Sequence, residues 1–393
     1  MPIPSGSKGP IEPIESAHAS PSFRVARDLW NGFLDVEEAE ESLRDLGLAL
    51  DTLTVETNQA CPLRCTYCYL QNRPKVEPVD FEVLTRFLDQ ALEAGVKQFG
   101  AVGKEPFADG RAMSLLEHVD RLPGRSKCRV GVVTNGILTR RYLDRLQHLS
   151  RPLDYIDISL DGPADANDRV RGLGSFAKTM AAIQALADFP NLVVAATVHA
   201  GTVDTLIPFL FELWQRNVRT VSFSPVLDLT NDPRVASLCL RPEELFGRVL
   251  HELSRHASTV QDRQIVVDLP LEWTAYGVHR GHIPISQVRE DKNGCTYFQP
   301  KGDVPLYLKV QLLPQNAWRW ARITADGYFL GSLRLASSPD YRDGAVGSII
   351  GQTFAELHAE SLNRKGWLTD DWNEAIRWAT DQALPASGLL VLA

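Results

Sequence analysis

Residues 58–70 read NQACPLRCTYCYL and place Cys61, Cys65 and Cys68 within eight positions of one another. Cubane iron-sulfur clusters and structural zinc sites each take four ligands. Three clustered thiols therefore leave one coordination position to be filled by another group. The stretch follows TLTVET (52–57), an alternation of apolar and polar residues that is typical of a strand. We expect the cysteines to lie on the loop that leaves this strand.

Composition places the chain among globular proteins. The 393 residues are 44% hydrophobic and 23% charged, and no apolar run is long enough to cross a bilayer. The first 23 residues contain no apolar signal-peptide segment, so we expect a cytoplasmic protein without a membrane partner. A net charge of -8 disfavours nucleic acid as a partner, and the six cysteines suit metal ligation better than a disulfide framework.

Short apolar strands alternate with amphipathic helices as far as about residue 258. Strands are predicted at 52–57, 97–102, 129–134, 154–160, 191–198 and 219–224. Helices are predicted at 79–94, 111–122, 139–149, 175–188, 204–216 and 242–257. Such alternation indicates parallel strands with right-handed crossovers. The sequence therefore predicts an α/β fold with a partial (β/α)6 TIM-like barrel.

Three regions are expected along the chain. Residues 1–49 form a lead-in with a helix at 24–47, residues 50–258 form the partial barrel, and residues 259–393 form a smaller α+β extension. The alternation is expected to fail after residue 258, where Pro-rich and Trp-rich segments such as 269–277 and 312–331 begin. Within the second of these, Asp326 and Gly327 predict the turn of a hairpin.

Four unusual loops follow the first four predicted strands. The cysteines follow the first, GKEP (103–106) the second, TNG (134–136) ends the third and LDG (160–162) ends the fourth. Parallel α/β sheets place their chemistry at the carboxyl ends of the strands. We therefore expect the four loops to converge on one rim.

The three cysteines alone are compatible with two kinds of metal centre. Each thiolate of the triplet can bind a different iron of one 4Fe-4S cluster, which leaves the fourth iron free for an exogenous ligand. A zinc staple would need a further Cys or His, and Cys128, Cys239, Cys295 and the nine histidines show no paired spacing. A non-catalytic zinc module therefore stays as the remote alternative.

The C-x3-C-x2-C pattern, with Tyr67 before its third cysteine, resembles the radical S-adenosylmethionine (SAM) family. The resemblance implies that SAM chelates the fourth iron through its amino and carboxylate groups. It also implies an external electron donor such as flavodoxin or ferredoxin, and a 5'-deoxyadenosyl radical that removes hydrogen from the substrate. The cofactor would carry the hard chemistry, while the protein positions the substrate and excludes water.

The loops add further parts of the resemblance. GKEP resembles the family's GGEP loop, which binds the SAM amino group, and the match falls on Gly103, Lys104 and Glu105. The chain departs from the family at Lys104, where a second glycine would give more flexibility. In the family, a serine and an arginine lie near the ribose and the methionine carboxylate, which implies these roles for Ser159 and Arg171.

Three further polar residues are considered for SAM binding. Asn135 at a strand end is expected either to hydrogen-bond SAM or to be a satisfied strand-end group, and the same two alternatives hold for Ser159. Asp161 is expected to form a turn. His199, at the end of the fifth strand, is either a structural histidine or an adenine contact.

The order of motifs after residue 159 resembles the subgroup whose SPASM or shortened twitch extension serves peptide modification. ITADGYFLGS (323–332) is similar to a segment that normally leads to a cluster cysteine, and that cysteine is absent here. Residues 259–393 contain only Cys295, so we expect a single 4Fe-4S cluster. Cys295 is either a hydrogen-atom donor to a substrate radical or a buried apolar thiol.

The expected substrate is a peptide. The alternative is the same radical chemistry on a small natural product, sugar or nucleoside. That alternative stays close because nothing before residue 50 is long enough for a typical leader-binding winged helix.

Overall fold

The structure is a computed structural model that describes residues 19–47, 50–229, 232–257, 262–300, 304–314, 319–364 and 366–383. The first 18 residues of the expected lead-in lie outside these ranges. The chain divides into two compact units. Among the described residues, the first comprises 50–229, 232–239 and 319–364, and the second comprises 19–47, 240–257, 262–300, 304–314 and 366–383. The expected division at residues 49 and 258 stays a prediction.

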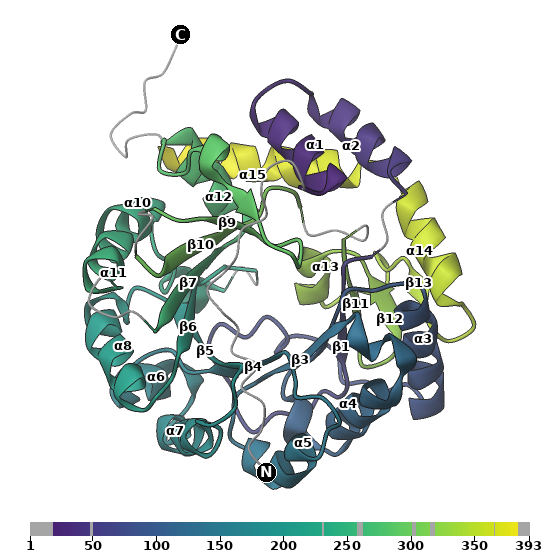
Figure 1. The fold of residues 1–393 in the computed structure, drawn as a ribbon, viewed down its shortest axis with the longest axis horizontal. Coiled ribbons are helices and arrows are strands. Elements are labelled where there is room, and N and C mark those ends of the chain that lie inside the picture. Colours follow the sequence, from purple (N-terminus) through teal and green to yellow (C-terminus); the bar gives the residue numbers. More distant parts are fainter. Residues whose placement is uncertain are drawn as a thin grey trace. The chain divides into compact units, whose positions relative to one another are not determined.

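The first unit contains the predicted barrel strands. Strands β1 (Thr52–Glu56), β2 (Gln98–Val102), β3 (Arg129–Thr134), β4 (Tyr155–Ser159), β5 (Leu192–Val198) and β6 (Thr220–Pro225) pair in parallel in sequence order. The helices between them are α3 (Phe81–Glu93), α4 (Arg111–Arg121), α5 (Leu143–Gln147), α6 (Ala164–Arg171), α7 (Ser175–Ala185) and α8 (Leu206–Gln215). These helices cover one face of the curved sheet (Figure 1). The α/β fold with a partial (β/α)6 barrel is confirmed.

Strand alternation separates a helix-covered face from a more polar face. In β5, Leu192, Val194, Ala196 and Val198 are buried, while the residues between them are half-buried. On the other face, a tyrosine side chain fills the space beside two glycines of the neighbouring strands. Tyr155 on β4 lies over two glycines, because a Cβ at Gly100 would lie 2.6 Å from its hydroxyl and a Cβ at Gly131 would overlap its ring. The two small residues make room for one aromatic ring.

The C-terminal segment of the first unit extends the sheet at β1. Strand β11 (Trp320–Ile323) pairs in parallel with β1, and β12 (Tyr328–Leu330) and β13 (Gly347–Ser348) follow as antiparallel neighbours. Helices α13 (Leu333–Ser337) and α14 (Phe354–Asn363) complete the segment. The predicted hairpin at Asp326-Gly327 is confirmed, with Gly327 at a φ of 88° that favours glycine.

The second unit contains a four-stranded sheet with helices. Its strands are β7 (Gln264–Leu269), β10 (Leu306–Val310), β9 (Thr296–Phe298) and β8 (Arg289–Glu290), in that order, with β7 and β10 parallel. Its helices are α1 (Pro21–Trp30), α2 (Val36–Asp45), α10 (Pro242–Glu244), α11 (Leu250–Ala257), α12 (Leu271–His279) and α15 (Trp367–Ala383). A π-helical turn at Leu245–Val249 joins α10 to α11.

Two expectations about the second unit are corrected. The alternation does not fail after residue 258, because β7 and α12 form one more strand-helix pair, with Pro270 at the N-cap of α12. Proline is tolerated at a helix start, so the Pro-rich appearance of 269–277 was misleading. The single lead-in helix expected at 24–47 is two helices, α1 and α2, separated at residues 31–35.

No helix among the described residues combines the length and the apolar character that a membrane span requires.

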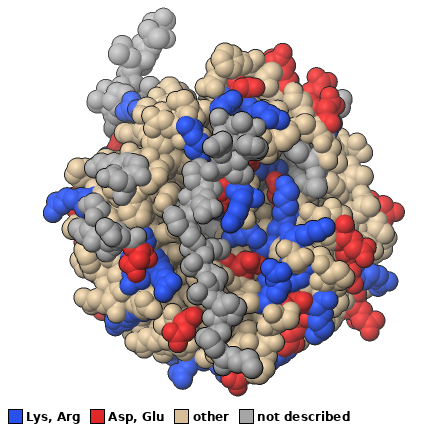
Figure 2. Space-filling view, viewed as in Figure 1, with Lys and Arg blue, Asp and Glu red and all other residues tan. Residues whose placement is uncertain are grey.

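Figure 2 shows Lys and Arg side chains gathered near the middle of one face of this acidic chain.

Candidate functional site

The three clustered cysteines lie on the loop after β1. Cys61, Cys65 and Cys68 are all half-buried and form no disulfide. The Cys68 amide donates to the Cys65 carbonyl at 3.1 Å, and the Leu63 amide donates to the Cys61 sulfur at 3.4 Å. These contacts fold the loop tightly and leave all three thiols available as ligands.

The charge that the three cysteines would carry as thiolates favours a positively charged ligand. Burial raises the pKa of all three thiols, that of Cys65 to about 12, and the neighbouring thiols of the loop add to the shift at Cys65. Three thiolates held this close therefore need a cationic partner, and the soft sulfur donors match iron-sulfur chemistry. Within the described ranges no group of three or more Cys, His, Asp or Glu residues gathers around a position for a single metal ion.

Asn58 and Asn135 tie the cysteine loop to the next two loops. The Asn58 amide donates to the Glu105 carbonyl at 3.1 Å, and its oxygen accepts from the Ala60 amide at 2.8 Å. From the end of β3, the Asn135 side chain donates to the Cys61 sulfur at 3.6 Å. The loops after β1, β2 and β3 therefore meet at the first cysteine.

The side chain of Glu105 is turned into the protein. It is fully buried and accepts from the Thr134 hydroxyl at 2.6 Å, the Asn135 amide at 2.8 Å and the Phe107 amide at 3.0 Å. Burial raises the pKa of this carboxyl, and the three donors act in the opposite direction. These contacts make Glu105 a brace between the second and third loops, while its contact with a ligand stays a prediction.

Gly103 and Lys104 form the half-buried part of the GKEP loop. Gly103 has a φ of 125°, and a Cβ there would lie 3.4 Å from the Cα of Glu56, so only glycine fits without strain. Lys104 is half-buried, and its charge is among the influences that lower the pKa of Cys68. The residue that departs from the family pattern therefore brings a cation toward the third thiol.

Asp161 joins the cysteine loop to α6 and β5. Its carboxylate accepts from Arg171 Nε at 2.7 Å and Nη2 at 2.8 Å, from the Thr197 amide at 2.9 Å and from the Tyr67 hydroxyl. The guanidinium also lies 5.6 Å from the centre of the Tyr67 ring. Asp161 is fully buried, so it is a structural anchor and not the simple turn former expected from its place before a glycine.

The remaining predicted SAM contacts lie at the ends of β4 and β5. Ser159 is half-buried at the last position of β4. His199 is 1% exposed, and its Nδ1 accepts from the Gly201 amide at 3.1 Å. Its Nε2 therefore carries the proton, and this buried atom has no hydrogen-bond partner in the described chain. Burial lowers the pKa of the ring, so it is neutral at pH 7.

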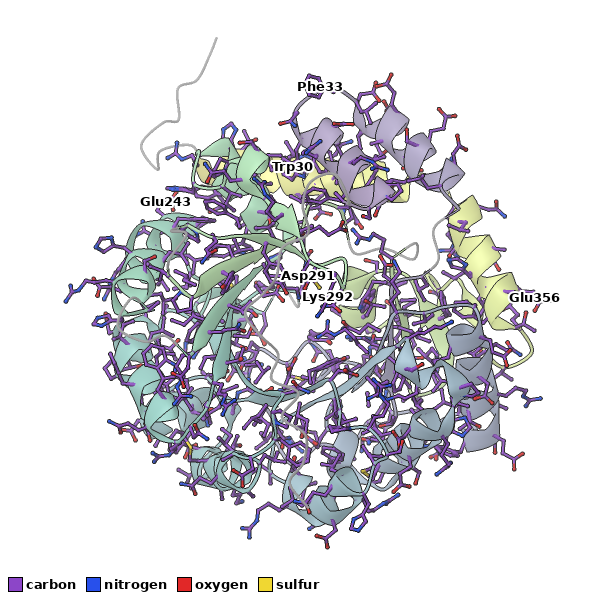
Figure 3. The ribbon with its side chains drawn as sticks, viewed as in Figure 1. Trp30, Phe33, Glu243, Asp291, Lys292 and Glu356 are labelled. Atoms are coloured by element: carbon purple, nitrogen blue, oxygen red, sulfur yellow. The ribbon has the colours of Figure 1, made fainter. Side chains whose placement is uncertain are left out.

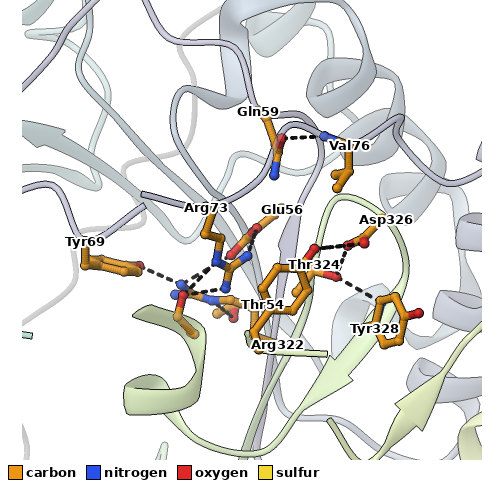
Figure 4. A network of polar contacts seen from close by, with 12 residues as sticks. Thr54, Glu56, Gln59, Tyr69, Arg73, Val76, Arg322, Thr324, Asp326 and Tyr328 are labelled. Atoms are coloured by element: carbon orange, nitrogen blue, oxygen red, sulfur yellow. Dashed lines mark hydrogen bonds and ion pairs between the residues drawn. The ribbon is translucent and has the colours of Figure 1, made fainter. Parts of the chain in front are cut away.

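A second polar network lies beside the cysteine loop and was not found from the sequence. Arg73 Nη1 binds the Glu56 carboxylate at 2.8 Å, and Arg322 Nη1 donates to the Tyr69 hydroxyl at 2.6 Å and lies 3.6 Å from Glu56 Oε1 (Figure 4). Arg73 also donates to the Ala336 carbonyl at 2.8 Å. The network joins β11 to the residue that follows Cys68. No spacing signal could reveal it, because Arg322 is remote in sequence from its partners.

Cys295 lies in the second unit, apart in sequence from the cysteine triplet. It ends a turn in which its amide donates to Asp291 Oδ1 at 2.9 Å and its carbonyl accepts from the Asp291 amide at 2.8 Å. Figure 3 labels Asp291 and Lys292 in this turn. The thiol is half-buried, so the buried apolar alternative does not describe it fully.

Residues 55–205 match the family model of the radical SAM superfamily. This match runs from the end of β1 past β5 and includes the loops that follow β1, β2, β3 and β4. The chain therefore contains a radical SAM domain, which indicates an enzyme of the radical SAM class.

Two kinds of cyclase are among the curated relatives. GTP 3',8-cyclase of Rhizobium leguminosarum bv. trifolii is 29% identical over 161 residues, which is 40% of this chain and 46% of the relative. PqqA peptide cyclase of Gluconobacter oxydans is 32% identical over 168 residues, which is 41% of this chain and 45% of the relative. The chain thus matches about half the length of these relatives.

Solved structures share the fold. SuiB of Streptococcus suis, bound to its precursor peptide SuiA, aligns with a TM-score of 0.58 at 12% identity over 90% of this chain and 73% of SuiB. The protein anSMEcpe, bound to AdoMet and a peptide, aligns with a TM-score of 0.54 at 16% identity over 84% of this chain and 82% of the other.

Proposed function

We propose that this protein reductively cleaves SAM and abstracts a hydrogen atom from a peptide. The observation that carries the proposal is the hydrogen bond from Asn135 to the Cys61 sulfur, within a chain of contacts that binds three loops around one thiol. A 4Fe-4S cluster on Cys61, Cys65 and Cys68, with SAM at its fourth iron, would supply the 5'-deoxyadenosyl radical.

The protein's own contribution is to hold the sulfur ligands and bind SAM. Asn135 stabilises negative charge on the Cys61 sulfur by donating to it. Gly103 lets the second loop approach β1 closely, and Lys104 places a cation at the same loop. Glu105 keeps this loop in place through its three donors. The backbone of 103–105 is thereby prepared to receive the SAM amino group.

Tyr67, Ser159, Arg171 and His199 complete the proposed SAM site. Two donors of Arg171 are held by Asp161, which fixes the guanidinium plane and leaves further donors for a carboxylate. The Nε2 proton of His199 is a buried donor without a partner in the described residues, and such a donor gains from an acceptor on a ligand. This supports an adenine contact for His199.

We infer one cluster per chain and a SPASM- or twitch-related extension without auxiliary thiolates. Outside the triplet the chain has only Cys128, Cys239 and Cys295, and the last is the only cysteine after residue 258. An auxiliary 4Fe-4S cluster takes at least three thiolates. Redox-neutral chemistry fits this arrangement, with Cys295 as a candidate hydrogen-atom donor.

The peptide substrate is supported by the fold neighbours bound to peptides and by the similarity to a peptide cyclase. The second candidate is a nucleotide or another small molecule, and the similarity to GTP 3',8-cyclases favours it. A soluble carrier such as flavodoxin or ferredoxin in the cytoplasm would supply the electron, and neither nucleic acid nor a membrane is needed as a partner.

Anaerobic reconstitution tests the proposal. We expect brown protein with about four irons per chain that converts SAM to methionine and 5'-deoxyadenosine when dithionite is added. A colourless protein with bound zinc and no SAM cleavage would contradict it. Mass spectrometry of candidate peptides and of GTP after the reaction would then separate the two substrate classes.

A further inference from the structure

The third cysteine of the triplet is held differently from the first. Cys61 accepts a hydrogen bond from the Asn135 side chain at 3.6 Å. The described residues place no side-chain donor on the Cys68 sulfur. Burial raises the pKa of the Cys68 thiol, and hydrogen bonding from the backbone amides of Leu70 and Gln71 acts in the opposite direction. The position of this sulfur therefore depends on the turn that follows it.

The turn after Cys68 is compact. The Gln71 amide donates to the Cys68 carbonyl at 3.1 Å, and the Cys68 amide donates to the Cys65 carbonyl at 3.1 Å. The Gln71 side chain also donates to the Cys65 carbonyl. Tyr69 lies inside this turn, so a movement of Tyr69 would also move the backbone amides that face the Cys68 sulfur.

Arg322 of β11 holds the Tyr69 side chain from a remote part of the chain. Its Nη1 donates to the Tyr69 hydroxyl at 2.6 Å, and its guanidinium carbon lies 5.7 Å from the centre of the Tyr69 ring (Figure 4). Its Nε donates to the hydroxyl of Thr54, its register partner on β1, at 3.3 Å. Arg322 is 6% exposed and also lies 5.2 Å from the centre of the Trp320 ring. Strand pairing and two aromatic rings thus fix its position.

Arg73 ties the residues after this turn to the same C-terminal segment. Its Nη1 binds the Glu56 carboxylate at 2.8 Å, and its Nε donates to the Ala336 carbonyl at 2.8 Å. Its guanidinium carbon lies 4.3 Å from the centre of the Tyr341 ring. Ala336 and Tyr341 are fully buried in an apolar cluster against which Tyr69 packs. The stretch from Tyr69 to Arg73 is therefore held at both of its ends.

The network contains more positive than negative charge. The side chains of Arg73, Arg322 and Glu56 are 1%, 7% and 2% exposed, which sets two buried cations against one carboxylate. Burial raises the pKa of Glu56, and the two arginines act in the opposite direction. Buried ion pairs add little net stability compared with apolar packing, and their best-supported use is to specify one arrangement of the chain. The second buried cation therefore indicates a positioning role.

We propose that Arg322 is a positioning residue for the third cysteine. It acts through Tyr69 on the turn 68–71, and the amides of this turn orient the Cys68 sulfur as a ligand. The inference rests on the proposed function, in which this sulfur binds one iron of the cluster. Hydrogen bonds to the sulfur ligands and the net charge around a cluster set its reduction potential. The C-terminal segment of the first unit thus influences the cluster without supplying a ligand.

Three variants separate the contact from the charge. Tyr69→Phe removes only the hydroxyl and keeps the charge of Arg322. Arg322→Met removes the charge and the donors, whereas Arg322→Lys keeps the charge and one donor group. Arg319→Met is the matched control, because Arg319 precedes the same strand and binds Asp51 at 2.9 Å, at the end of β1 remote from the cysteines. Thermal unfolding checks that each variant folds, and the conservative Tyr69→Phe keeps the test decisive if Arg322→Met does not fold.

The first measurement uses the metal-free protein. Fragment-ion mass spectrometry gives the rate at which iodoacetamide alkylates each thiol, and Cys61 is the internal reference. We expect Cys68 to react about tenfold faster in Tyr69→Phe and in Arg322→Met, with no further increase in the double variant, because both changes break one contact. Arg322→Lys should stay within about threefold of the wild type. The rate at Cys61, and both rates in Arg319→Met, should be unchanged.

The second measurement uses the anaerobically reconstituted protein. A redox titration followed by electron paramagnetic resonance gives the midpoint potential of the cluster. In Arg322→Met we expect the ratio of reduced to oxidised cluster at a fixed potential to fall about tenfold, which is about 59 mV for a one-electron couple. Tyr69→Phe should shift the potential in the same direction by a smaller amount, and Arg319→Met should leave it unchanged.

Selective acceleration at Cys68 in Tyr69→Phe is the result that supports the proposal. Unchanged alkylation of Cys68 in Tyr69→Phe would overturn it, because any effect of Arg322→Met would then be one of charge or stability. Equal acceleration at Cys61 and Cys68 would indicate general loosening of the fold and would also overturn it. Failure of the wild-type protein to take up a cluster would contradict the proposed function, whereas the alkylation rates of the metal-free protein test the positioning role independently.

Discussion

Arg171 holds the buried carboxylate of Asp161 through two parallel hydrogen bonds of 2.7 and 2.8 Å. The same carboxylate accepts from Tyr67, which lies between the second and third cysteines of the triplet. One ion pair therefore connects the cysteine loop, the end of β4 and α6. Loss of this ion pair should therefore lower the stability of the protein and disturb the geometry of the proposed site.

Replacement of Asp161 by Asn should destabilise the protein strongly. Removing one partner of a buried pair leaves Arg171 with an uncompensated buried charge, which costs about 3–5 kcal/mol. Urea denaturation of the metal-free protein would measure the loss. Asp165→Asn, an exposed position on α6, is the control and should change the free energy of unfolding by less than about 0.5 kcal/mol. Equal effects of the two substitutions would contradict the anchoring role.

The alanine substitutions of Gly100 and Gly131 should differ in whether Tyr155→Phe restores the stability that they remove. A Cβ at Gly100 meets only the Tyr155 hydroxyl within 3.5 Å, whereas a Cβ at Gly131 meets the ring itself. Each glycine-to-alanine change should cost about 1–3 kcal/mol because of overpacking. Tyr155→Phe should rescue Gly100→Ala and leave Gly131→Ala unrescued. A double-mutant cycle by thermal unfolding measures both couplings, and equal rescue would disprove the stacking of Tyr155 over the two residues.

Substitution of Cys65 by Ala should abolish iron loading and SAM cleavage, because the proposed cluster would lose one of three protein ligands. Iron analysis and the visible spectrum after anaerobic reconstitution measure the first effect. Cys239→Ala is the matched control, since this thiol is also half-buried and donates to the Val235 carbonyl. Retention of a full cluster in Cys65→Ala would remove the basis of the proposed function.

His199 should make the metal-free protein less stable in acid. Burial lowers the pKa of this ring below its usual value of 6.5, so the unfolded chain binds a proton more readily than the folded chain. The stability contributed by neutral His199 is therefore present above pH 6.5 and is lost as the pH falls through the folded-state pKa.

The measurement is the free energy of unfolding between pH 7.5 and about 5. His199→Gln should flatten part of its decline, whereas His148→Gln, at an exposed histidine, should leave the slope unchanged. An identical slope in wild type and His199→Gln would show that the ring is not buried in the neutral form.

Local patterns were sufficient for the barrel strands. The alternation of LVVAATV in β5 appears directly as alternating burial, because successive side chains of a strand face opposite sides. The prediction was wrong at residues 269–277, where it relied on the proline content and not on the periodicity of the apolar residues. Pro270 suggested irregular structure, although it begins helix α12.

The cysteine triplet and its loops were also accessible from the sequence, since each follows a strand end and parallel strands bring such loops together. The function of the buried charged residues could not be predicted from the sequence. The sequence did not show that Glu105 is held by three donors of the protein, while its contact with a ligand stays a prediction. Asp161 was expected to form a turn and is instead a buried anchor.

The sequence by itself determined the barrel, the thiol loop and the match to the radical SAM domain, because these depend on short-range periodicity and on residue types at fixed spacing. Only the tertiary structure decided that β11 pairs with β1 and that Arg322 reaches Tyr69 and Glu56. Such pairings depend on which surfaces fill the open edge of a sheet after folding. No local pattern encodes that choice, because the partners are separated by most of the chain.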